Sequence, residues 1–582
     1  MALDYALVAI VGIVLIVGAA AFSSKLGVAA PLLLVLIGIG YSFIPGVPAI
    51  EVEPDLILMG LLPLLLYAAA IQLPVVDFRR NFGPISALSV VLVVVSALIA
   101  GFVLFTLLPD LDLATAIALG AVISPPDVVA ATAIGKRLGL PPRLLAILEG
   151  EGLVNDATAL VLLRTAIAAA ALTASGTFDI WGAVGDFGYA VVVAAAVGLV
   201  VGVVAVVVRR RLDQPILDTA ISFAVPFIAY LPAEELHASG VISVVVAGIY
   251  SGHQSARLSP QSRVAERLNW RTLQFVLENG VFLLMGAQLA GIVSEIEAEA
   301  LPWHQAVLLG ILAAAILMVV RFGFVWPLLF FVRRGERRNI ERVAANQEAV
   351  ERVKRFDAAG APHVERRIRR FLRRSDRYRN DVTALRAEGL GWRGAVVLGW
   401  AGMRGVVTLA AAQSLPRETP YYEQLVLIAF TVAIVTLLVQ GGTLPFVIRL
   451  TGIRGSDQAA DRRELAMLLD EMEEAGLATL ESPELPGGLS VAPDVLERVR
   501  QDTSLASAVA WERAEHTEGE SLADAPHRQY RELRRQVLDA ERAALLEARA
   551  RGSYPSRILQ RAQSLLDLEE TRLSQVDSES DH

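Results

Sequence analysis

Two carboxylates stand in stretches of the chain that are otherwise as apolar as a membrane-spanning segment. Asp127 ends the motif SPPD after an apolar run, and Asp156 follows Asn155 in the run GLVNDATALVLL. A carboxylate at the centre of a bilayer costs roughly 2.5–3.5 kcal/mol, so each of them needs a partner or a function there. Monovalent cations bind hard oxygen ligands, and a carboxylate can hold either a cation or a proton. We therefore predict that a cation and a proton compete for Asp156; the alternative is a buried aspartate in an ion pair.

The residues before Asp127 also interrupt their own helix. Pro125 and Pro126 lack backbone donors, so a regular α-helix cannot continue through them. Irregular backbone at membrane depth is tolerated only inside the protein or beside a cavity. A second interruption runs from Gly399 to Gly405 in GWAGMRGVV. Interrupted apolar segments that carry a carboxylate are typical of the ion site of a transporter.

Three motifs in these segments resemble one family of membrane proteins. SPPDVVA, EGEGLVNDATALV and GWAGMRGVVTLAAA are similar to motifs of the monovalent cation/proton antiporters of the NhaP and animal sodium–proton exchanger type. The resemblance covers roughly residues 1–450. It implies a secondary active antiporter that exchanges Na⁺, or Li⁺ or K⁺, for H⁺ by alternating access. The cation- and proton-binding residues that it implies are Asp156, Asp127 and Asn155, with the two aspartates as Na⁺ ligands.

The neutral Asn155 bears on the stoichiometry. In the superfamily that this chain resembles, an Asp-Asp pair accompanies electrogenic exchange and an Asn-Asp pair accompanies electroneutral exchange. Charge counting agrees, because one carboxylate carries either one H⁺ or one Na⁺. We therefore predict 1:1 exchange, while Asn155 can also serve simply as a hydrogen-bond partner inside its helix.

Two positions depart from the family's pattern. The family usually has Thr-Asp-Pro near Asp127, whereas this chain has Pro126 where the threonine would stand. Ser124 is the nearby residue that could supply a hydroxyl, and Asp127 could bind the ion or cap the half-helix after the break. Gly152 stands where family members often have serine, so water or backbone oxygen would have to replace that ligand.

Four charged residues are expected to support the site. Glu151 lies four residues before Asn155, so the two share one face of a helix. The resemblance implies that Glu151 pairs with a core arginine, and Arg321 and Arg404 both remain candidates. An unpaired buried charge is costly, so a match between buried acids and bases is expected. Glu278 resembles a buried glutamate of the exchangers, either on the ion pathway or structural.

The composition excludes several classes of site. The chain has 582 residues, of which 54% are hydrophobic, and a mean hydropathy of +0.52, which indicates a membrane protein. It contains no cysteine, so disulfides and thiolate metal sites are excluded, and its seven histidines show no metal-ligand spacing. The tail carries no nucleotide-binding glycine motif and no catalytic triad signature. We expect no enzyme activity, no cofactor and no nucleic-acid partner.

The apolar runs predict an all-α membrane protein. About 20 apolar residues span the hydrocarbon core. On that rule the chain holds about thirteen spans, at roughly 4–22, 28–45, 55–73, 84–108, 113–134, 144–172, 180–208, 214–231, 237–252, 270–291, 303–332, 392–415 and 422–449.

The connections between these spans alternate in charge. Basic residues such as Lys25, Lys136 and Arg209 fall in every second connection, and acids such as Asp110 and Glu234 fall in the others. Because basic connections stay in the cytoplasm, we predict a protein of the cell membrane with its N-terminus outside and its tail in the cytoplasm.

The span count suggests two inverted repeats of six spans separated by a single span. The two interruptions then fall in the fifth span of each repeat, which is the pattern of a transporter built on two broken, crossing helices. We expect core helices at about 84–172 and 303–449 and interface helices at about 1–73 and 180–291. By the resemblance, the protein is expected to form a homodimer.

Two polar segments complete the chain. Residues 333–389 contain 17 basic and 9 acidic residues, and we interpret them as a helical cytoplasmic loop, either solvated or in contact with anionic lipid. Residues 451–582 are predicted to be a helical regulatory or dimer-contact tail, with helices at about 461–476, 491–515 and 527–572 and a break at Pro486–Gly488. From residue 452 onward this tail contains 16 basic and 27 acidic residues.

Other functions remain open at this point. The pattern does not distinguish Na⁺/H⁺ from K⁺/H⁺ exchange. A passive cation channel or a transport-dead sensor is a further alternative, although a channel needs a continuous ring of carbonyl or carboxylate groups, and the sequence shows no such filter.

Overall fold

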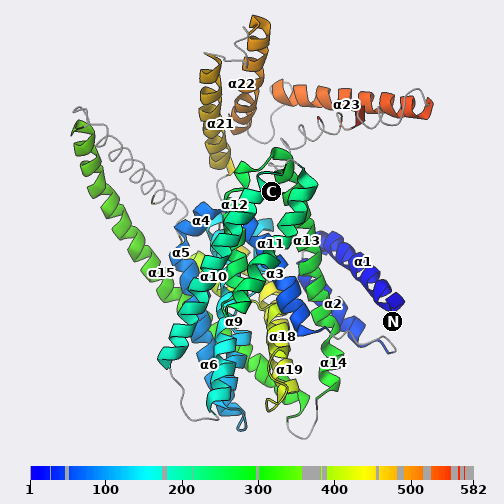
Figure 1. Ribbon diagram of the computed structural model, residues 1–582, viewed down its shortest axis with the longest axis vertical. Helices are drawn as coiled ribbons and strands as arrows, with labels where there is room; N and C mark the ends of the chain where they lie inside the picture. Colours follow the sequence, from blue (N-terminus) through cyan, green and yellow to red (C-terminus); the bar gives the residue numbers. More distant parts are fainter. Residues whose placement is uncertain are drawn as a thin grey trace. The chain divides into compact units, whose positions relative to one another are not determined.

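The computed structural model describes residues 2–26, 28–45, 52–173, 180–212, 214–296, 301–356, 390–453, 458–481, 491–515 and 526–551, together with a few single positions (Figure 1). All regular secondary structure in these ranges is helical. The chain divides into two compact units, Met1–Ile453 and Arg454–His582.

The first half of the larger unit leads to the first broken helix. The helices, in chain order, are α1 (Ala2–Leu26), α2 (Ala30–Ser42), the π-helix η1 (Leu56–Leu61) continuing into α3 (Leu62–Gln72), α4 (Val75–Arg80), α5 (Phe82–Ser86), the π-helix η2 (Ala87–Leu92) continuing into α6 (Val93–Leu107), α7 (Leu113–Ile123), α8 (Val129–Arg137) and α9 (Pro142–Thr173).

The second half contains the second broken helix. Its helices are α10 (Ile180–Arg209), α11 (Pro215–Glu235), α12 (Gly240–His253), α13 (Pro260–Ala287), α14 (Leu289–Ser294), α15 (Trp303–Phe356), α17 (Trp392–Trp400), α18 (Val406–Gln413) and α19 (Tyr422–Thr436), the last of which continues through the π-helix η5 (Leu437–Gly441) into α20 (Gly442–Thr451).

Every predicted span coincides with one of these helices or with two or three consecutive ones, and the all-α membrane fold is confirmed. Among the described residues, seven helices are long and apolar enough to cross a bilayer, and further apolar helices are shorter. Two boundaries differ. Helix α13 begins at Pro260, ten residues before the predicted span, because Ser259 caps it by accepting a hydrogen bond from the Ser262 N–H at 3.1 Å. Helix α15 continues without interruption to Phe356, well into the predicted loop at 333–389, and residues 357–389 lie almost entirely outside the described ranges.

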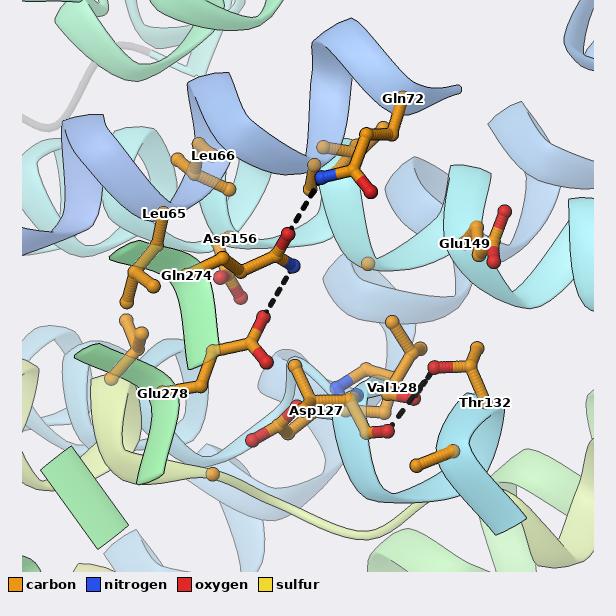
Figure 2. Close-up of a pocket in the computed structure, with 18 of the residues that line it drawn as sticks. Leu65, Leu66, Gln72, Asp127, Val128, Thr132, Glu149, Asp156, Gln274 and Glu278 are labelled. Carbon is orange, nitrogen blue, oxygen red and sulfur yellow. Dashed lines mark hydrogen bonds between the residues drawn. The ribbon is translucent and has the colours of Figure 1, made fainter. Parts of the chain in front are cut away.

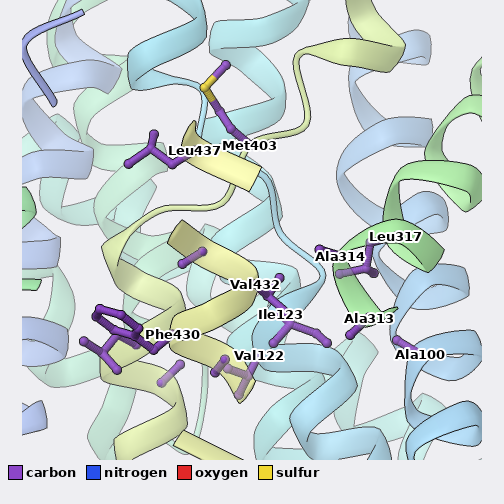
Figure 3. Packing of buried hydrophobic residues seen from close by; sticks show 14 of the residues in the cluster. Ala100, Val122, Ile123, Ala313, Ala314, Leu317, Met403, Phe430, Val432 and Leu437 are labelled. Atoms are coloured by element: carbon purple, nitrogen blue, oxygen red, sulfur yellow. The ribbon is translucent and has the colours of Figure 1, made fainter. Parts of the chain in front are cut away.

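The two broken helices lie at the centre of one packed group. Helices α6, α7, α9, α15, α17, α18 and α19 contact one another, and we call them, with α8 and α20, the broken-helix group. Figure 3 shows the buried side chains that close the group around the break, among them Ile123, Leu317 and Met403. Small residues let the backbones approach closely, as expected in a bilayer: a side chain at Gly120 of α7 would collide with the Ala97 carbonyl of α6.

The remaining helices form a second group. Helices α3, α10, α11, α12 and α13 pack against each other, and α1 and α2 pack along α13; we call these the scaffold group. Trp270 of α13 is fully buried there, and its Nε1 donates a hydrogen bond to Ser222 Oγ at 3.0 Å. Beside it, Arg209 forms ion pairs with Asp218 and Glu266 at 2.7 Å each. These contacts tie the ends of α10, α11 and α13 together.

The smaller unit is also helical. It contains α21 (Gln458–Leu480), α22 (Pro493–Glu515) and α23 (Pro526–Arg551). Helices α21 and α22 pack as a pair, and Asp470 accepts hydrogen bonds from Ser507 and Trp511 across it. The predicted break at Pro486–Gly488 and most residues after 551 lie outside the described ranges.

Candidate functional site

The two interrupted segments cross, and their backbones hydrogen-bond at the crossing. The Asp127 N–H donates to the carbonyl of Met403 at 2.6 Å. The first break spans residues 124–128, and the second spans 401–405. Each break leaves backbone N–H and C=O groups without helical partners. The hydrogen bond between Asp127 and Met403 gives one such group in each break a partner in the other break.

Arg404 donates hydrogen bonds to carbonyls at the first break. Its side chain is 1% exposed, and its Nε and Nη2 donate to the carbonyls of Ile123 and Ser124 at 3.1 and 3.3 Å. These carbonyls end helix α7, where the helix dipole is negative and a cation is stabilising. The Arg404 N–H itself donates to Thr436 Oγ1 of α19 at 2.9 Å. Arg404 therefore balances a half-helix terminus.

Arg321 is the arginine that pairs with Glu151. Its Nη1 and Nη2 donate to the two carboxylate oxygens of Glu151 at 2.5 and 2.9 Å. Its Nε donates to the carbonyl of Leu398, the third-last residue of α17, at 2.9 Å. This choice between the two arginines was open in the sequence. The Arg321 guanidinium thereby neutralises the Glu151 carboxylate.

Asn155 is tied to the first break. Its Nδ2 donates to the carbonyl of Pro126 at 2.6 Å, so the asparagine satisfies a carbonyl that the broken helix leaves free. Its Oδ1 is buried and accepts no hydrogen bond within the described part of the chain. Asp156, the next residue, projects from another side of α9 and lines a cavity together with Asp127.

Asp127 both accepts a hydrogen bond at the start of a half-helix and faces the cavity. Its Oδ1 accepts a hydrogen bond from the Val129 N–H at 2.8 Å, at the first residue of α8. Its other oxygen, Oδ2, packs against the backbone of Gly405, where any side chain would collide with the carboxylate. Glycine at 405 is thus required for the aspartate to sit at the crossing.

A cavity of about 720 Å³ reaches this crossing from one end of the bundle. Asp156, Asp127 and Glu278 all line it, as Figure 2 shows. Lys136 and Glu149 also line the cavity and form an ion pair at 2.8 Å, in which the Lys136 side chain is 63% exposed and so reaches the surface. We call this the basic end, because the connections with Lys136 and Arg209–Arg211 lie there. The acidic end is the opposite one, with Asp110, Asp112 and Glu234.

Glu278 approaches the cavity from the scaffold group and is held by two glutamines that the sequence analysis missed. Gln274 Nε2 donates to Glu278 Oε1 at 2.6 Å, and Gln72 Nε2 donates to Gln274 Oε1 at 2.8 Å (Figure 2). Gln72 Nε2 also donates to the Ala68 carbonyl at 2.9 Å. The spacing of four between Gln274 and Glu278 was a readable signal, whereas the contact with Gln72, 202 residues away, was not.

The structure shows what the nearby Ser124 hydroxyl contacts and explains why glycine stands at position 152. The Ser124 hydroxyl donates to the carbonyls of Gly120 and Val93 at 2.9 and 3.2 Å, so it serves the end of α7. A side chain at Gly152 would collide with Val128, which fills the space a serine would need. The cavity lining includes two hydroxyl residues that the sequence analysis did not select, Thr132 and Thr408.

The comparison with known proteins agrees with this architecture. Residues 11–450 match the family model described as the transmembrane sodium/hydrogen exchanger. The chain belongs to the sodium/hydrogen exchanger family. It is 28% identical to an uncharacterised Na⁺/H⁺ exchanger of Mycobacterium tuberculosis over 97% of this chain and 96% of that one.

Two further proteins extend the comparison. The sodium, potassium, lithium and rubidium/H⁺ antiporter of Bacillus pumilus is 27% identical over 72% of this chain and 57% of that one. The structure of the sodium proton antiporter MjNhaP1 from Methanocaldococcus jannaschii at pH 8 shares the fold, with a TM-score of 0.53 and 14% identity over 76% of this chain and 96% of that one. The family consists of multi-pass membrane transporters that exchange cations for protons, and the predicted antiporter fold and class are confirmed.

Proposed function

We propose that this exchanger carries one Na⁺ against one H⁺ and that both ions bind in turn at Asp156. The observation that carries the proposal is the position of Asp156 in the cavity beside Asp127. Among the described residues, no group donates a hydrogen bond to the Asp156 carboxylate. A carboxylate without such a partner is free to bind either ion.

The charges around Asp156 support the exchange of one Na⁺ for one H⁺. Glu151 is neutralised by Arg321, and Arg404 is occupied by the carbonyls at the end of α7. Asn155 is neutral and contributes an oxygen that has no other partner among the described residues. Asp127, fixed by the Val129 N–H, adds a carboxylate oxygen to the cation site. Electroneutral exchange follows if Asp156 alone changes its occupant.

Orientation is part of the same proposal. Basic connections remain in the cytoplasm, so the basic end, where the cavity opens, faces the cytoplasm of the cell and the N-terminus lies outside. On this assignment Asp156 is accessible from the cytoplasm through the cavity. We further propose that the protein works in the cell membrane as a homodimer and that the unit Arg454–His582 is a cytoplasmic regulatory domain.

The test is exchange by purified protein in sealed vesicles with an imposed pH gradient. Adding Na⁺ should dissipate the gradient. Adding K⁺ or Li⁺ instead measures which other cations the wild-type protein exchanges, a question raised by the name of the Bacillus pumilus relative, the sodium, potassium, lithium and rubidium/H⁺ antiporter. A channel would instead pass Na⁺ without moving protons. Cation flux that leaves the pH gradient intact would contradict the proposal. Protein ending at Ile453 should still exchange, and a shifted pH response would assign regulation to the removed unit.

A further inference from the structure

Two polar side-chain contacts join the broken-helix group to the scaffold group at the acidic end. Arg164 of α9 forms an ion pair with Glu234 of α11 at 2.8 Å. Gln413, the last residue of α18, donates from Nε2 to Oε1 of Gln288, the residue that follows α13, at 2.9 Å. Each contact therefore links one helix that builds the ion site to one helix of the scaffold.

The two contacts lie on the far side of Asp156 from the cavity. Arg164 follows Asp156 by eight residues on α9, which places it about 12 Å further along the helix axis. Between them, a void of about 10 Å³ touches Asp156 and is lined by apolar residues that include Leu160, Leu163 and Ala411. A void of that size holds at most about one water. Asp156 is thus closed off at the acidic end and reached from the basic end.

Neither contact is strong enough to hold the two groups together permanently. The Arg164 side chain is 50% exposed and that of Glu234 is 22% exposed, and exposed ion pairs contribute little. The amide pair forms one hydrogen bond of the two it could form, because Gln288 Nε2 and Gln413 Oε1 are buried without partners among the described residues. A buried amide group that lacks a hydrogen-bond partner is unfavourable. When the pair separates and water reaches both amides, hydrogen bonds to water offset part of the free energy of the broken hydrogen bond.

We propose that Arg164–Glu234 and Gln288–Gln413 form a latch that keeps the acidic end closed while the cavity is open at the basic end. The latch opens when the broken-helix group moves against the scaffold group and exposes Asp156 to the acidic end. It favours the conformation seen here by a modest margin, so it sets how the protein divides its time between the two conformations. This inference rests on the proposed alternation of Asp156 between the two sides.

The absence of cysteine from the chain makes the latch directly testable. Ala411→Cys places a thiol on the closed side of Asp156, and Ala133→Cys places one in the cavity lining. Each reporter is labelled with a membrane-impermeant thiol reagent in right-side-out and in inside-out vesicles, so the result does not depend on the assumed orientation. The latch variants are Arg164→Gln and Gln413→Leu, alone and together. Glu234 is left unchanged, because its Oε1 also accepts a hydrogen bond from the Gly240 N–H at 2.9 Å.

The latch predicts opposite changes at the two reporters. Labelling of Ala411→Cys from the acidic end should rise several-fold in each latch variant and further in the double variant, while labelling of Ala133→Cys from the basic end should fall. Arg164→Lys keeps the positive charge, so its labelling rates at both reporters should stay closer to those of the unmodified latch than to those of Arg164→Gln. Arg417→Gln, which removes another exposed arginine at the acidic end, should leave both rates unchanged.

Two results would overturn the latch. Unchanged labelling in the double variant would show that the contacts do not hold the end closed. A rise at both reporters would indicate loosened packing instead of a shift between two conformations. Failure of the proposed function is separate: if the wild-type protein does not exchange cations for protons but the labelling shifts as described, the latch stands and the ion assignment falls.

Discussion

Arg321 holds Glu151 through two hydrogen bonds of 2.5 and 2.9 Å, and neither side chain is more than 2% exposed. The pair joins α15 to α9, and the Arg321 Nε contact with Leu398 extends it to α17. Three helices of the broken-helix group therefore meet at one buried ion pair. Removing one charge leaves the other without compensation at the centre of the membrane domain.

Glu151→Ala should accordingly destabilise the folded protein by about 3–5 kcal/mol, as expected when one partner of a buried pair is lost. Arg321→Ala should do the same, and the double variant should lose less than the sum of the two, because no lone charge remains. Thermal unfolding in detergent measures all three. Additive losses would contradict the pairing.

Gly405→Ala should reduce the rate of exchange about a hundredfold, because displacing a functional group by about 1 Å can lower a rate by about that factor. The added methyl group would push the Asp127 carboxylate away from the crossing. Gly323→Ala on α15 is the matched control, because a side chain there meets nothing within 4 Å. The initial rate of Na⁺-dependent proton release compares them. Equal activity of the two variants would show that the position of Asp127 is not important.

Exchange should not respond to membrane voltage. One occupant charge at Asp156 is replaced by another, and Asn155 adds none. With K⁺ and valinomycin setting the potential at a fixed pH gradient, the rate should stay constant. A rate that follows the imposed potential would contradict the 1:1 count.

Asn155→Asp should lower the stability of the folded protein by about 1–3 kcal/mol, because it removes the donor to the Pro126 carbonyl.

Gln274→Leu should weaken cation uptake from the cavity more than it slows the maximal rate. The variant leaves the charge of Glu278 in place but removes its donor, so the carboxylate loses its fixed position facing the cavity. We expect a several-fold higher apparent KM for Na⁺. Glu278→Gln should change KM in the same direction, and the two effects should not add. A loss confined to the maximal rate would show that the hydrogen bond between Gln274 and Glu278 has only a structural role.

The sequence predicted the parts of the fold that depend on local chemistry. Span positions follow from runs of apolar residues, and the breaks follow from Pro125, Pro126 and the glycines near 402. The acids and arginines of the site stand out because a charge in an apolar run is rare. For Asp127 the sequence left two roles open, an ion ligand or a helix cap; the hydrogen bond from the Val129 N–H is local, because it involves a residue only two positions further along the chain.

Long-range partners could not be predicted in this way. Arg321 and Arg404 are equally unusual in sequence, and only the packing of α15 against α17 brings Arg321, not Arg404, to Glu151. Gln72 and Gln274 are ordinary residues until α3 and α13 meet. The Gly152 position reads as a missing ligand in the sequence, yet in the fold it is space filled by Val128.

The central claim is that Na⁺ and H⁺ share one site at Asp156, and the dependence of the apparent KM for Na⁺ on pH tests it most directly. Wherever the site is mostly protonated, competition predicts that the KM rises about tenfold for each unit that the pH falls, because the ligand must lose its proton to bind the ion. The maximal rate should stay the same, and Asp156→Asn should show no exchange although it inserts and folds. A KM that does not change with pH, or substantial Na⁺-dependent proton flux through Asp156→Asn, would contradict the account.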